Sequence, residues 1–408
     1  MTKPATGSKL ESASAVHTRL QEELTARAQD ETLRTIRNII PISAREVRID
    51  GKQLINFASN DYLGLSRHPE LIERCRQAID SYGAGTTSSR LVSGNIDLYE
   101  RIEARLVALK GSEAALVFPS GFQLNATVLQ ALAGSETCFA LDRLCHASII
   151  AGTTRSSLHW FRFAHNDVQD LERKLTTAAR RMGKRSPKDI EQWIVTESVF
   201  SMDGDQAPID DLEALSARTG SCLYIDEAHA TGVFGDHGMG LCHHKQTSGP
   251  AFFISMGTFG KGLGSFGAYI ACPKIVKDYL INKCPGLIYS TALPPAVLAA
   301  IDAALDLVPA MKAERRRLLN TASYLRSQLQ SMGYQTGAST TQIIPILVSS
   351  PGQALALSKH LEERGILVPA IRPPTVPARS CRLRISLSAA HTDSDVERLC
   401  EAIKTWRM

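Results

Sequence analysis

Between residues 110 and 272, short apolar runs bounded by turn residues alternate with longer segments that have the period of a helix. The runs are rich in Val, Ile and Phe without a polar residue at every second position, which indicates strands buried on both faces. Six runs fit this description: EAALVFPSG, ETCFALD, EQWIVTES, CLYIDEAH, PAFFISMG and FGAYIAC. Alternation of this kind predicts an α/β fold with a mostly parallel sheet covered by helices.

The segments around these strands predict the helices and the domain organisation. Helices are expected in GFQLNATVLQALAG, in PIDDLEALSARTG and in NDVQDLERKLTTAARRMG, where Asn166 is the expected N-cap. Residues 10–38 have helical period, and residues 69–110 hold two amphipathic helices. After Pro295, one long helical stretch to about residue 332 precedes IIPILV, GQALALSKHLEERG, ILVPAI, CRLRISLS and SDVERLCEAIKTW. We therefore expect an N-terminal helical arm over 1–55, a large domain over 56–295 and a smaller C-terminal α+β domain over 296–408.

Composition excludes several classes of function. The chain has 46 Lys and Arg spread among 41 acidic residues, so its net charge of +5 forms no basic stripe that would indicate nucleic-acid binding. The nine cysteines form no C-x-x-C pair, and no apolar run approaches 18 residues. We expect a cytoplasmic protein with no membrane span. The segment CHHK at 242–245 is too isolated to predict a metal site, so we expect none.

Polar residues that directly follow the predicted strands are the candidates for a site. In open α/β sheets, ligands bind beyond the carboxyl ends of the strands, and the free N–H groups at a helix start suit a phosphate. Four of the predicted strands are followed by such residues, namely Ser120, Gly121 and Phe122, then Ser201, then Asp226 with His229, and Thr258 with Lys261.

The stretch TFGKGLGSFG contains a G-x-G-x-x-G, formed by Gly262, Gly264 and Gly267, with Lys261 directly before it. A dinucleotide fingerprint would follow the first strand of a βαβ unit, open a helix and have an acidic residue about 20 positions on. Here the strand-like AYIAC follows instead, and no acidic residue stands at that distance. A Walker A motif is excluded as well, because no Ser or Thr follows the lysine. The glycines therefore serve Lys261.

A lysine in a crowded, glycine-walled and mostly apolar loop loses its proton readily and attacks an aldehyde, and pyridoxal 5′-phosphate (PLP) is the cofactor held in this way. Asp226 at a strand end is expected beside the pyridine nitrogen, where it keeps that nitrogen protonated. His229, three residues on, is expected at the phenolic oxygen. The phosphate and the ring edges are expected to meet Ser120, Gly121, Phe122, Thr258 and Ser201.

The chain resembles the α-oxoamine synthases, PLP enzymes of fold type I, from about residue 30 to its C-terminus. The motifs that carry the resemblance are NFASNDYLGLSRHP, SSRLVSGN, FRFAHNDV, TESVFSMDGDQAP, DEAHATGVFG, TFGKGLG, AIRPPTVP and RLRISLSAAHT, in family order. Of these, AIRPPTVP together with AHNDV favours the branch that makes 8-amino-7-oxononanoate for biotin biosynthesis. The resemblance thus implies a homodimeric PLP acyltransferase that condenses L-alanine with a pimeloyl thioester and releases CO2 and the thiol carrier.

The same resemblance implies a role for individual residues. Lys261 would hold PLP covalently and later remove the α-proton of the amino acid, and His146 would stack on the cofactor ring. Arg384 would bind the substrate carboxylate as a bidentate fork with Asn60 nearby, and Thr375 would line the acyl pocket. Arg34 would meet the acyl substrate, with Arg37 as a rival one turn on. Two further residues would reach the phosphate in the neighbouring subunit, Ser290 and Thr291.

Several alternatives stay open at this point. A sister enzyme that uses glycine or serine, such as a glycine C-acetyltransferase, a 5-aminolevulinate synthase or a serine palmitoyltransferase, would share most of these motifs. A non-catalytic protein of the same fold is a more distant alternative. The chain departs from the family at Tyr99, where many relatives have His, and at Thr87 and Ser88, where they have two glycines. The carrier, coenzyme A or acyl carrier protein, and the role of the basic run RRMGKRSPK at 180–188 are not fixed.

Overall fold

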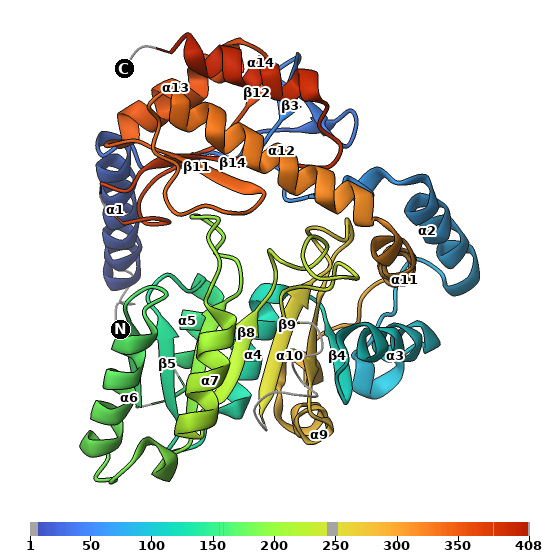
Figure 1. The fold of residues 1–408 in the computed structure, drawn as a ribbon, viewed down its shortest axis with the longest axis vertical. Helices are drawn as coiled ribbons and strands as arrows, with labels where there is room; N and C mark the ends of the chain where they lie inside the picture. Colours follow the sequence, from blue (N-terminus) through green and yellow to red (C-terminus); the bar gives the residue numbers. More distant parts are fainter. Residues whose placement is uncertain (1–6, 155, 158, 243–251, 378, 407–408) are drawn as a thin grey trace, which may run out of the picture.

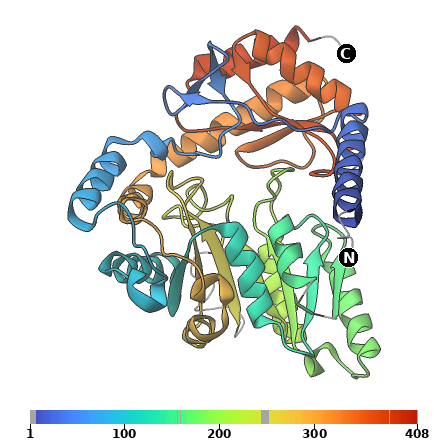
Figure 2. The ribbon, with the colours of Figure 1, turned by 180° about the vertical axis from the view of Figure 1, so that it is seen from behind.

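The computed structural model describes residues 7–154, 156–157, 159–242, 252–377 and 379–406. A seven-stranded sheet with its helices forms one layer, and the C-terminal strands and helices form a second layer against the carboxyl ends of that sheet (Figure 1). The view from behind shows the same two layers (Figure 2). Among the described residues, no helix is both long and apolar enough to cross a membrane.

The large sheet confirms the prediction of a mostly parallel α/β architecture. Its strand order is β4-β10-β9-β8-β7-β5-β6, and only β10 runs antiparallel to its neighbours. Six strands were predicted, whereas β6 was not, because it lies at the sheet edge and only one of its five residues is buried. The strands are β4 (Ala114–Phe118), β5 (Cys138–Asp142), β6 (His159–Phe163), β7 (Gln192–Glu197), β8 (Cys222–Asp226), β9 (Phe253–Thr258) and β10 (Ala268–Cys272).

Helices cover both faces of this sheet. Leucines of α6 and α7 pack on one face with Ile194, Leu223 and Phe253, and apolar side chains of α4, α5 and α9 pack on the other face with Phe118 and Ile254. The N-cap of α6 is Asp167, whose side chain accepts the N–H of Asp170, so the predicted Asn166 cap is wrong by one residue. The helices are α3 (Asp97–Lys110), α4 (Gly121–Leu132), α5 (Ala147–Thr153), α6 (Val168–Arg181), α7 (Ile209–Thr219), α9 (Lys274–Lys283) and α10 (Pro285–Ile288).

The C-terminal part is the small α+β unit that the sequence predicts. The single helix expected to about residue 332 is in fact two helices, which break at Met311, two residues after Pro309. Pro309 lies in the last turn of α11, where its missing N–H removes one hydrogen bond of the helical ladder and weakens the end of this helix. The elements are α11 (Pro295–Ala310), α12 (Lys312–Ser331), β11 (Ile343–Leu347), α13 (Pro351–Glu363), β12 (Ile366–Leu367), β13 (Ala370–Ile371), β14 (Arg382–Ser386) and α14 (Asp393–Lys404), with the sheet order β11-β14-β13.

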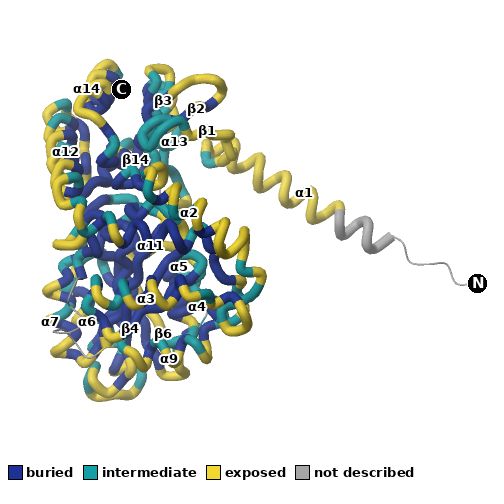
Figure 3. The backbone as a smooth tube through the Cα atoms, turned by 90° about the vertical axis from the view of Figure 1, so that its right-hand side faces the viewer, coloured by how far each residue is buried: buried dark blue, intermediate teal, exposed yellow. Residues whose placement is uncertain are grey.

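The N-terminal segment is helical over a shorter range than expected. Helix α1 (Gly7–Gln29) projects from the body of the molecule (Figure 3) and ends before residue 30, whereas helical period was expected to residue 38. Part of the expected 1–55 arm forms strands instead, and these pair through β3 with β12 of the C-terminal part. The division of the chain into three domains stays a prediction. The elements are β1 (Ile40–Pro41), β2 (Glu46–Ile49), β3 (Lys52–Asn56) and α2 (Pro69–Tyr82), with short turns of helix at Leu65–Arg67, Arg90–Gly94 and Pro187–Asp189.

Candidate active site

A cavity of about 200 Å³ lies at the carboxyl ends of the central strands. The strand register aligns Glu197, Asp226 and Met256 as neighbours across β7, β8 and β9. Parallel strands end at the same edge of a sheet, so three side chains far apart in the sequence meet here. The lining consists of Gly121, Phe122, Asn125, His146, Ser148, Glu197, Asp226, Ala228, His229, Met256, Thr258 and Lys261.

Lys261 faces this cavity from the turn that follows β9. Burial lowers the pKa of Lys261 to about 8, although the negative charge of Asp226 opposes that shift. The next residue, Gly262, packs against the backbone of Thr231 and Gly232, where a Cβ atom would come within 2.5 Å of a carbonyl oxygen. A glycine at position 262 therefore allows a close approach of two backbone segments directly beside Lys261.

A chain of hydrogen bonds joins Lys261 to Arg384. Lys261 Nζ lies 2.8 Å from His229 Nε2, and His229 Nδ1 lies 2.6 Å from the hydroxyl of Tyr62. That hydroxyl donates to Asn60 Oδ1 at 3.2 Å, and Arg384 Nη1 donates to the same oxygen at 3.1 Å. Burial, and then the positive charge of Lys261, lower the pKa of His229 well below its ordinary value. A neutral imidazole ring can accept a hydrogen bond at Nε2 while it donates one from Nδ1, so each hydrogen bond from Lys261 to Asn60 has one donor and one acceptor.

Asp226 is held by donors on both carboxylate oxygens. Asn125 Nδ2 donates to Oδ2 at 2.7 Å, and the backbone N–H of Ala228 donates to Oδ1 at 2.9 Å. Asn125 is fixed in turn by the hydroxyl of Tyr224, which donates to Asn125 Oδ1 at 2.6 Å. The carboxylate is therefore oriented before any ligand enters the cavity.

His146 stands at the wall of the cavity with its ring exposed. Its ring Nδ1 lies 2.7 Å from Ser148 Oγ, and its backbone N–H donates to Glu197 Oε1 at 2.7 Å. The ring of Phe122 meets it edge to face at 6.4 Å. Burial, and then the negative charge of Asp226, raise the pKa of Glu197 well above its ordinary value, which favours a neutral carboxyl group in the cavity.

The N-terminus of α4 opens toward the same cavity. Ser120 is the N-cap, and its hydroxyl accepts the N–H of Gln123, so this side chain is used within the helix. Gly121 and Phe122 follow in the first turn, where N–H groups have no partner within a helix. Thr258 lines the cavity as well, and its hydroxyl donates to the carbonyl of Gly267. These groups make a suitable site for an anion.

Arg384 on β14 donates hydrogen bonds to three protein acceptors and keeps one nitrogen unpaired. Its Nε donates to the carbonyl of Ser201, and its Nη1 donates to Asn60 and, at 2.6 Å, to Ser386 Oγ. Its Nη2 is buried and has no hydrogen-bond partner among the described residues. A buried guanidinium nitrogen without a partner indicates a ligand that accepts from it, and arginine binds carboxylates and phosphates strongly.

Other predicted residues lie outside the cavity. Arg34 donates to Thr375 at 2.8 Å on the surface, whereas its rival Arg37 is already paired with Glu362 and Asp50. In this chain Ser290 accepts from Gln123, Thr291 bridges to Ser89, and Ser201 contributes its carbonyl to Arg384. Among the departures, Thr87 adopts a φ of 55°, a conformation that glycine adopts readily, and Tyr99 is buried with its hydroxyl on the N–H of Leu293.

Sequence reasoning missed six residues of the site and its surroundings: Asn125, Ser148, Glu197, Ala228, Met256 and Tyr62. Two of them carried a usable signal. Glu197 ends a predicted strand just as Asp226 does, and Asn125 is four positions after Gly121 and so lies on the same helix face. Tyr62 carried no such signal in the sequence, because its segment joins the site only through tertiary packing.

No group of three or more His, Cys, Asp or Glu side chains that could hold a metal ion occurs among the described residues. The CHHK segment that was weighed as a metal site lies, apart from Cys242, outside those residues.

Comparison with known proteins identifies the family. The family model for aminotransferase class I and II matches residues 52–403. The chain belongs to this family. An 8-amino-7-oxononanoate synthase of Gluconacetobacter diazotrophicus is 47% identical over 88% of this chain and 89% of the relative. A protein of Desulfosudis oleivorans, to which its name assigns the same activity provisionally, is 50% identical over 95% of this chain and 98% of the relative.

Solved structures of two enzymes have the same fold. A variant of serine palmitoyltransferase from S. paucimobilis in which one lysine is replaced by alanine, with a bound PLP–myriocin aldimine, aligns with a TM-score of 0.86 and 28% identity over 94% of this chain and 96% of that chain. The 8-amino-7-oxononanoate synthase from Francisella tularensis aligns with a TM-score of 0.72 and 26% identity over 86% of this chain and 97% of that chain. The predicted fold type I architecture and the resemblance to the α-oxoamine synthases are both confirmed.

Proposed function

We propose that this protein is a PLP-dependent 8-amino-7-oxononanoate synthase, which condenses L-alanine with a pimeloyl thioester and releases CO2 and the free thiol carrier. The proposal rests on the observation that Lys261, Asp226 and His146 line one cavity. The hydrogen bonds that begin at Lys261 lead to Arg384, whose Nη2 has no partner among the described residues. The choice of alanine and pimeloyl rests on the relatives named for that activity, at 47–50% identity.

The residues of the cavity fit PLP. Lys261 has a lowered pKa and would hold the aldehyde, and the oriented carboxylate of Asp226 would meet the pyridine nitrogen. The exposed ring of His146 would stack on the cofactor, and the first turn of α4 with Thr258 would take the phosphate. His229 lies beside Lys261, where it would meet the phenolic oxygen.

When bound, PLP supplies an aldehyde for imine formation and a ring that accepts the electron pair left at the α-carbon of the amino acid. The chain supplies the remaining groups. Lys261 would take the α-proton at Nζ, which suits an amine with a pKa of about 8. Arg384 Nη2 would bind the carboxylate of alanine and so set which bond of the α-carbon faces the base.

A serine palmitoyltransferase-like activity is the second candidate, because the solved structures of that enzyme align with a higher TM-score than the oxononanoate synthase does. Overall fold similarity does not discriminate between substrates, whereas the higher sequence identity favours the oxononanoate synthases. The loop with Thr87 differs from the usual glycines and is therefore the place where acyl preference could deviate.

The experiment is a substrate matrix on the purified protein. L-alanine, glycine and L-serine are each combined with pimeloyl, acetyl, succinyl and palmitoyl thioesters, and the released thiol and the amino ketone are measured. We expect turnover with alanine and the pimeloyl thioester. Faster turnover with serine and the palmitoyl thioester would transfer the protein to the second candidate. Lys261→Ala should abolish the visible absorbance of covalently held PLP, while Lys283→Ala, which changes an exposed lysine, should retain it.

We also infer a cytoplasmic homodimer. Ser290 and Thr291 lie outside the cavity of their own chain, beside Tyr289, which is 83% exposed, and this arrangement supports contacts with a second subunit. The nine free cysteines support a reducing compartment. For the carrier, coenzyme A and acyl carrier protein both remain candidates.

A further inference from the structure

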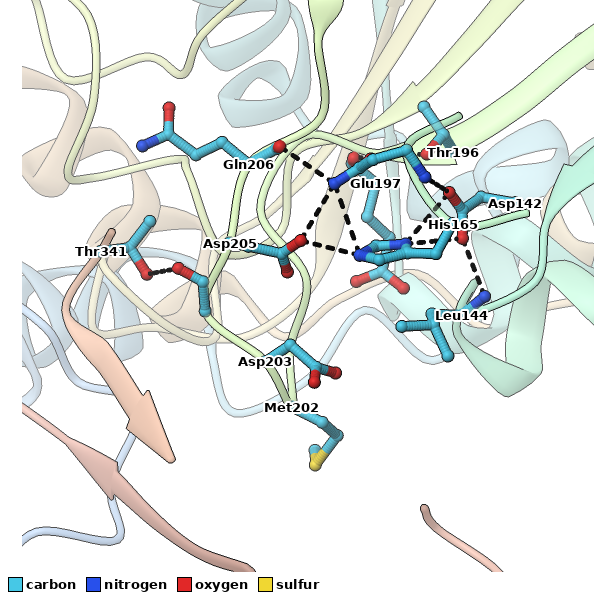
Figure 4. A network of polar contacts seen from close by, with 12 residues as sticks. Asp142, Leu144, His165, Thr196, Glu197, Met202, Asp203, Asp205, Gln206 and Thr341 are labelled. Atoms are coloured by element: carbon cyan, nitrogen blue, oxygen red, sulfur yellow. Dashed lines mark hydrogen bonds and ion pairs between the residues drawn. The ribbon is translucent and has the colours of Figure 1, made fainter. Parts of the chain in front are cut away.

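His165 makes hydrogen bonds from both ring nitrogens to carboxylates outside the cavity (Figure 4). Its Nδ1 lies 3.0 Å and 3.1 Å from the two oxygens of Asp142, and its Nε2 lies 2.7 Å from Asp205 Oδ2. Asp142 ends β5, whereas Asp205 belongs to the loop of residues 199–206 that follows β7. The ring also packs edge to face on Phe200 of that loop, with 4.3 Å between the centroids.

Two ionised carboxylates can only accept hydrogen bonds, so both nitrogens of the ring must carry a proton. Burial by itself lowers the pKa of His165, but the hydrogen bonds and charges of Asp142 and Asp205 outweigh it and raise the pKa to about 9. The other oxygen of Asp205, Oδ1, is buried without a partner among the described residues. His165 thus brings a positive charge to Asp205, whose Oδ2 also accepts from Asn166 Nδ2 at 2.9 Å.

The loop of residues 199–206 contacts the C-terminal sheet on its other side. The carbonyl of Gly204 accepts from the N–H of Thr340 at 3.0 Å and from Thr341 Oγ1 at 2.8 Å. Asp203 forms an ion pair with Arg382 at 2.6 Å. Gly204 has no room for a side chain, because a Cβ atom there would lie 1.9 Å from a carbonyl oxygen. The loop is thus held between the two sheets.

The same loop supplies the carbonyl of Ser201, which accepts from Arg384 Nε. We propose that His165 is a positioning residue, which through Asp205 fixes the loop of residues 199–206 and thereby the guanidinium of Arg384 that binds the amino-acid carboxylate. His165 does not line the cavity, so its effect reaches the substrate only through this loop. The inference rests on the role proposed above for Arg384.

The test compares His165→Gln with His159→Gln, a matched change on the neighbouring strand β6. In His165→Gln we expect the KM for the amino acid to rise about tenfold, as for a small displacement of a binding group, while kcat and the affinity for PLP change little. His159→Gln should match the wild type. Hydrogen exchange of the peptide over 199–206, measured without substrate, should accelerate only in the His165 variant.

A double variant separates positioning from a general loss of structure. If His165 acts through Arg384, adding His165→Gln to Arg384→Lys should raise the amino-acid KM no further, whereas fully additive effects would overturn the inference. A KM for His165→Gln within twofold of the control would overturn it as well. If His165→Gln does not fold, the amino-acid KM of Asp205→Asn is measured in the same way, and the same two criteria are applied to it. The measurement uses whichever amino acid the wild type prefers, so a preference for glycine or serine refutes the proposed function without obscuring this result.

Discussion

The unpaired Nη2 of Arg384 makes a quantitative prediction about amino-acid binding. The other donors of this guanidinium are already used by Ser201, Asn60 and Ser386, so the carboxylate would be bound from Nη2 rather than by the full fork that the family resemblance implies. Arg384→Lys keeps the positive charge but supplies a single nitrogen in place of three. A lysine at this place cannot serve the three protein acceptors and the substrate together.

The magnitude follows from the loss of one hydrogen bond between charged groups. Such a bond contributes about 1.5–3 kcal/mol net, and about 1.4 kcal/mol corresponds to a factor of ten in affinity. We therefore expect Arg384→Lys to weaken L-alanine binding by roughly 10- to 140-fold. The affinity for PLP should be unchanged, because Arg384 is not among the residues that line the cavity.

The assay is a spectrophotometric titration of the PLP-loaded wild type and variant with L-alanine and with ethylamine, which is alanine without its carboxylate. The variant should lose affinity for alanine and keep its affinity for ethylamine. An equal loss for both ligands would mean that the substitution disturbed the cavity in general. Alanine affinity within threefold of the wild type would refute the assignment of Nη2 to the carboxylate.

Three further predictions test the electrostatics. Lys110→Met leaves the fully buried carboxylate of Glu227 without its ion-pair partner and should lower the free energy of unfolding, measured by urea titration, by about 3–5 kcal/mol. The double variant Lys110→Met/Glu227→Gln should regain most of this lost stability. Because the pKa of Lys261 is about 8 when folded and 10.5 when unfolded, the unfolded state binds more protons in this window. The cofactor-free protein should therefore gain up to about 3 kcal/mol of stability from pH 8 to 10.5, less where cavity water screens the charge, and Lys261→Met should remove this gain. The basic run at 180–188 precedes the amino end of β7, at the edge of the sheet opposite the cavity. We therefore expect the triple variant Arg181→Glu, Lys184→Glu and Arg185→Glu to turn over carrier-protein and coenzyme A thioesters as fast as the wild type. A loss of turnover with the carrier-protein thioester alone would instead support docking of the carrier protein at this run.

The central part of the fold was predictable because burial on both faces gives parallel strands a strong pattern. The edge strand β6 is not an apolar run buried on both faces, so the pattern that identifies the other strands does not identify it, and it was missed. The strands β1 to β3 were missed for a related reason. All three are short, and although β1, β2 and β3 pair locally, the fourth strand of their sheet, β12, lies about 310 residues further along the chain than β3, so the sheet as a whole is not a local property.

Within the site, residues at strand ends were predictable, since the sheet itself brings Asp226, Thr258 and Lys261 together. Asn125, which orients Asp226, acts through a bond between a helix and a strand 101 residues apart. His165 lies in a motif that the sequence used only to recognise the family, and its two carboxylate partners follow different strands. Supporting residues of this kind depend on side-chain contacts that no periodicity reveals.

The two groups proposed to bind the amino acid belong to different sheets, since Lys261 follows β9 and Arg384 lies on β14. They are joined by Asn60 and Tyr62, in a segment that leaves β3 and is therefore anchored to the C-terminal part through β12. A second link, the loop of residues 199–206, ties Arg384 back to the large sheet. Because these two links bind different nitrogens of the guanidinium and come from different layers, the distance between the base and the carboxylate-binding group is set by the packing of one layer on the other. The selection of the α-proton is thus a property of the interface between the layers rather than of either layer alone.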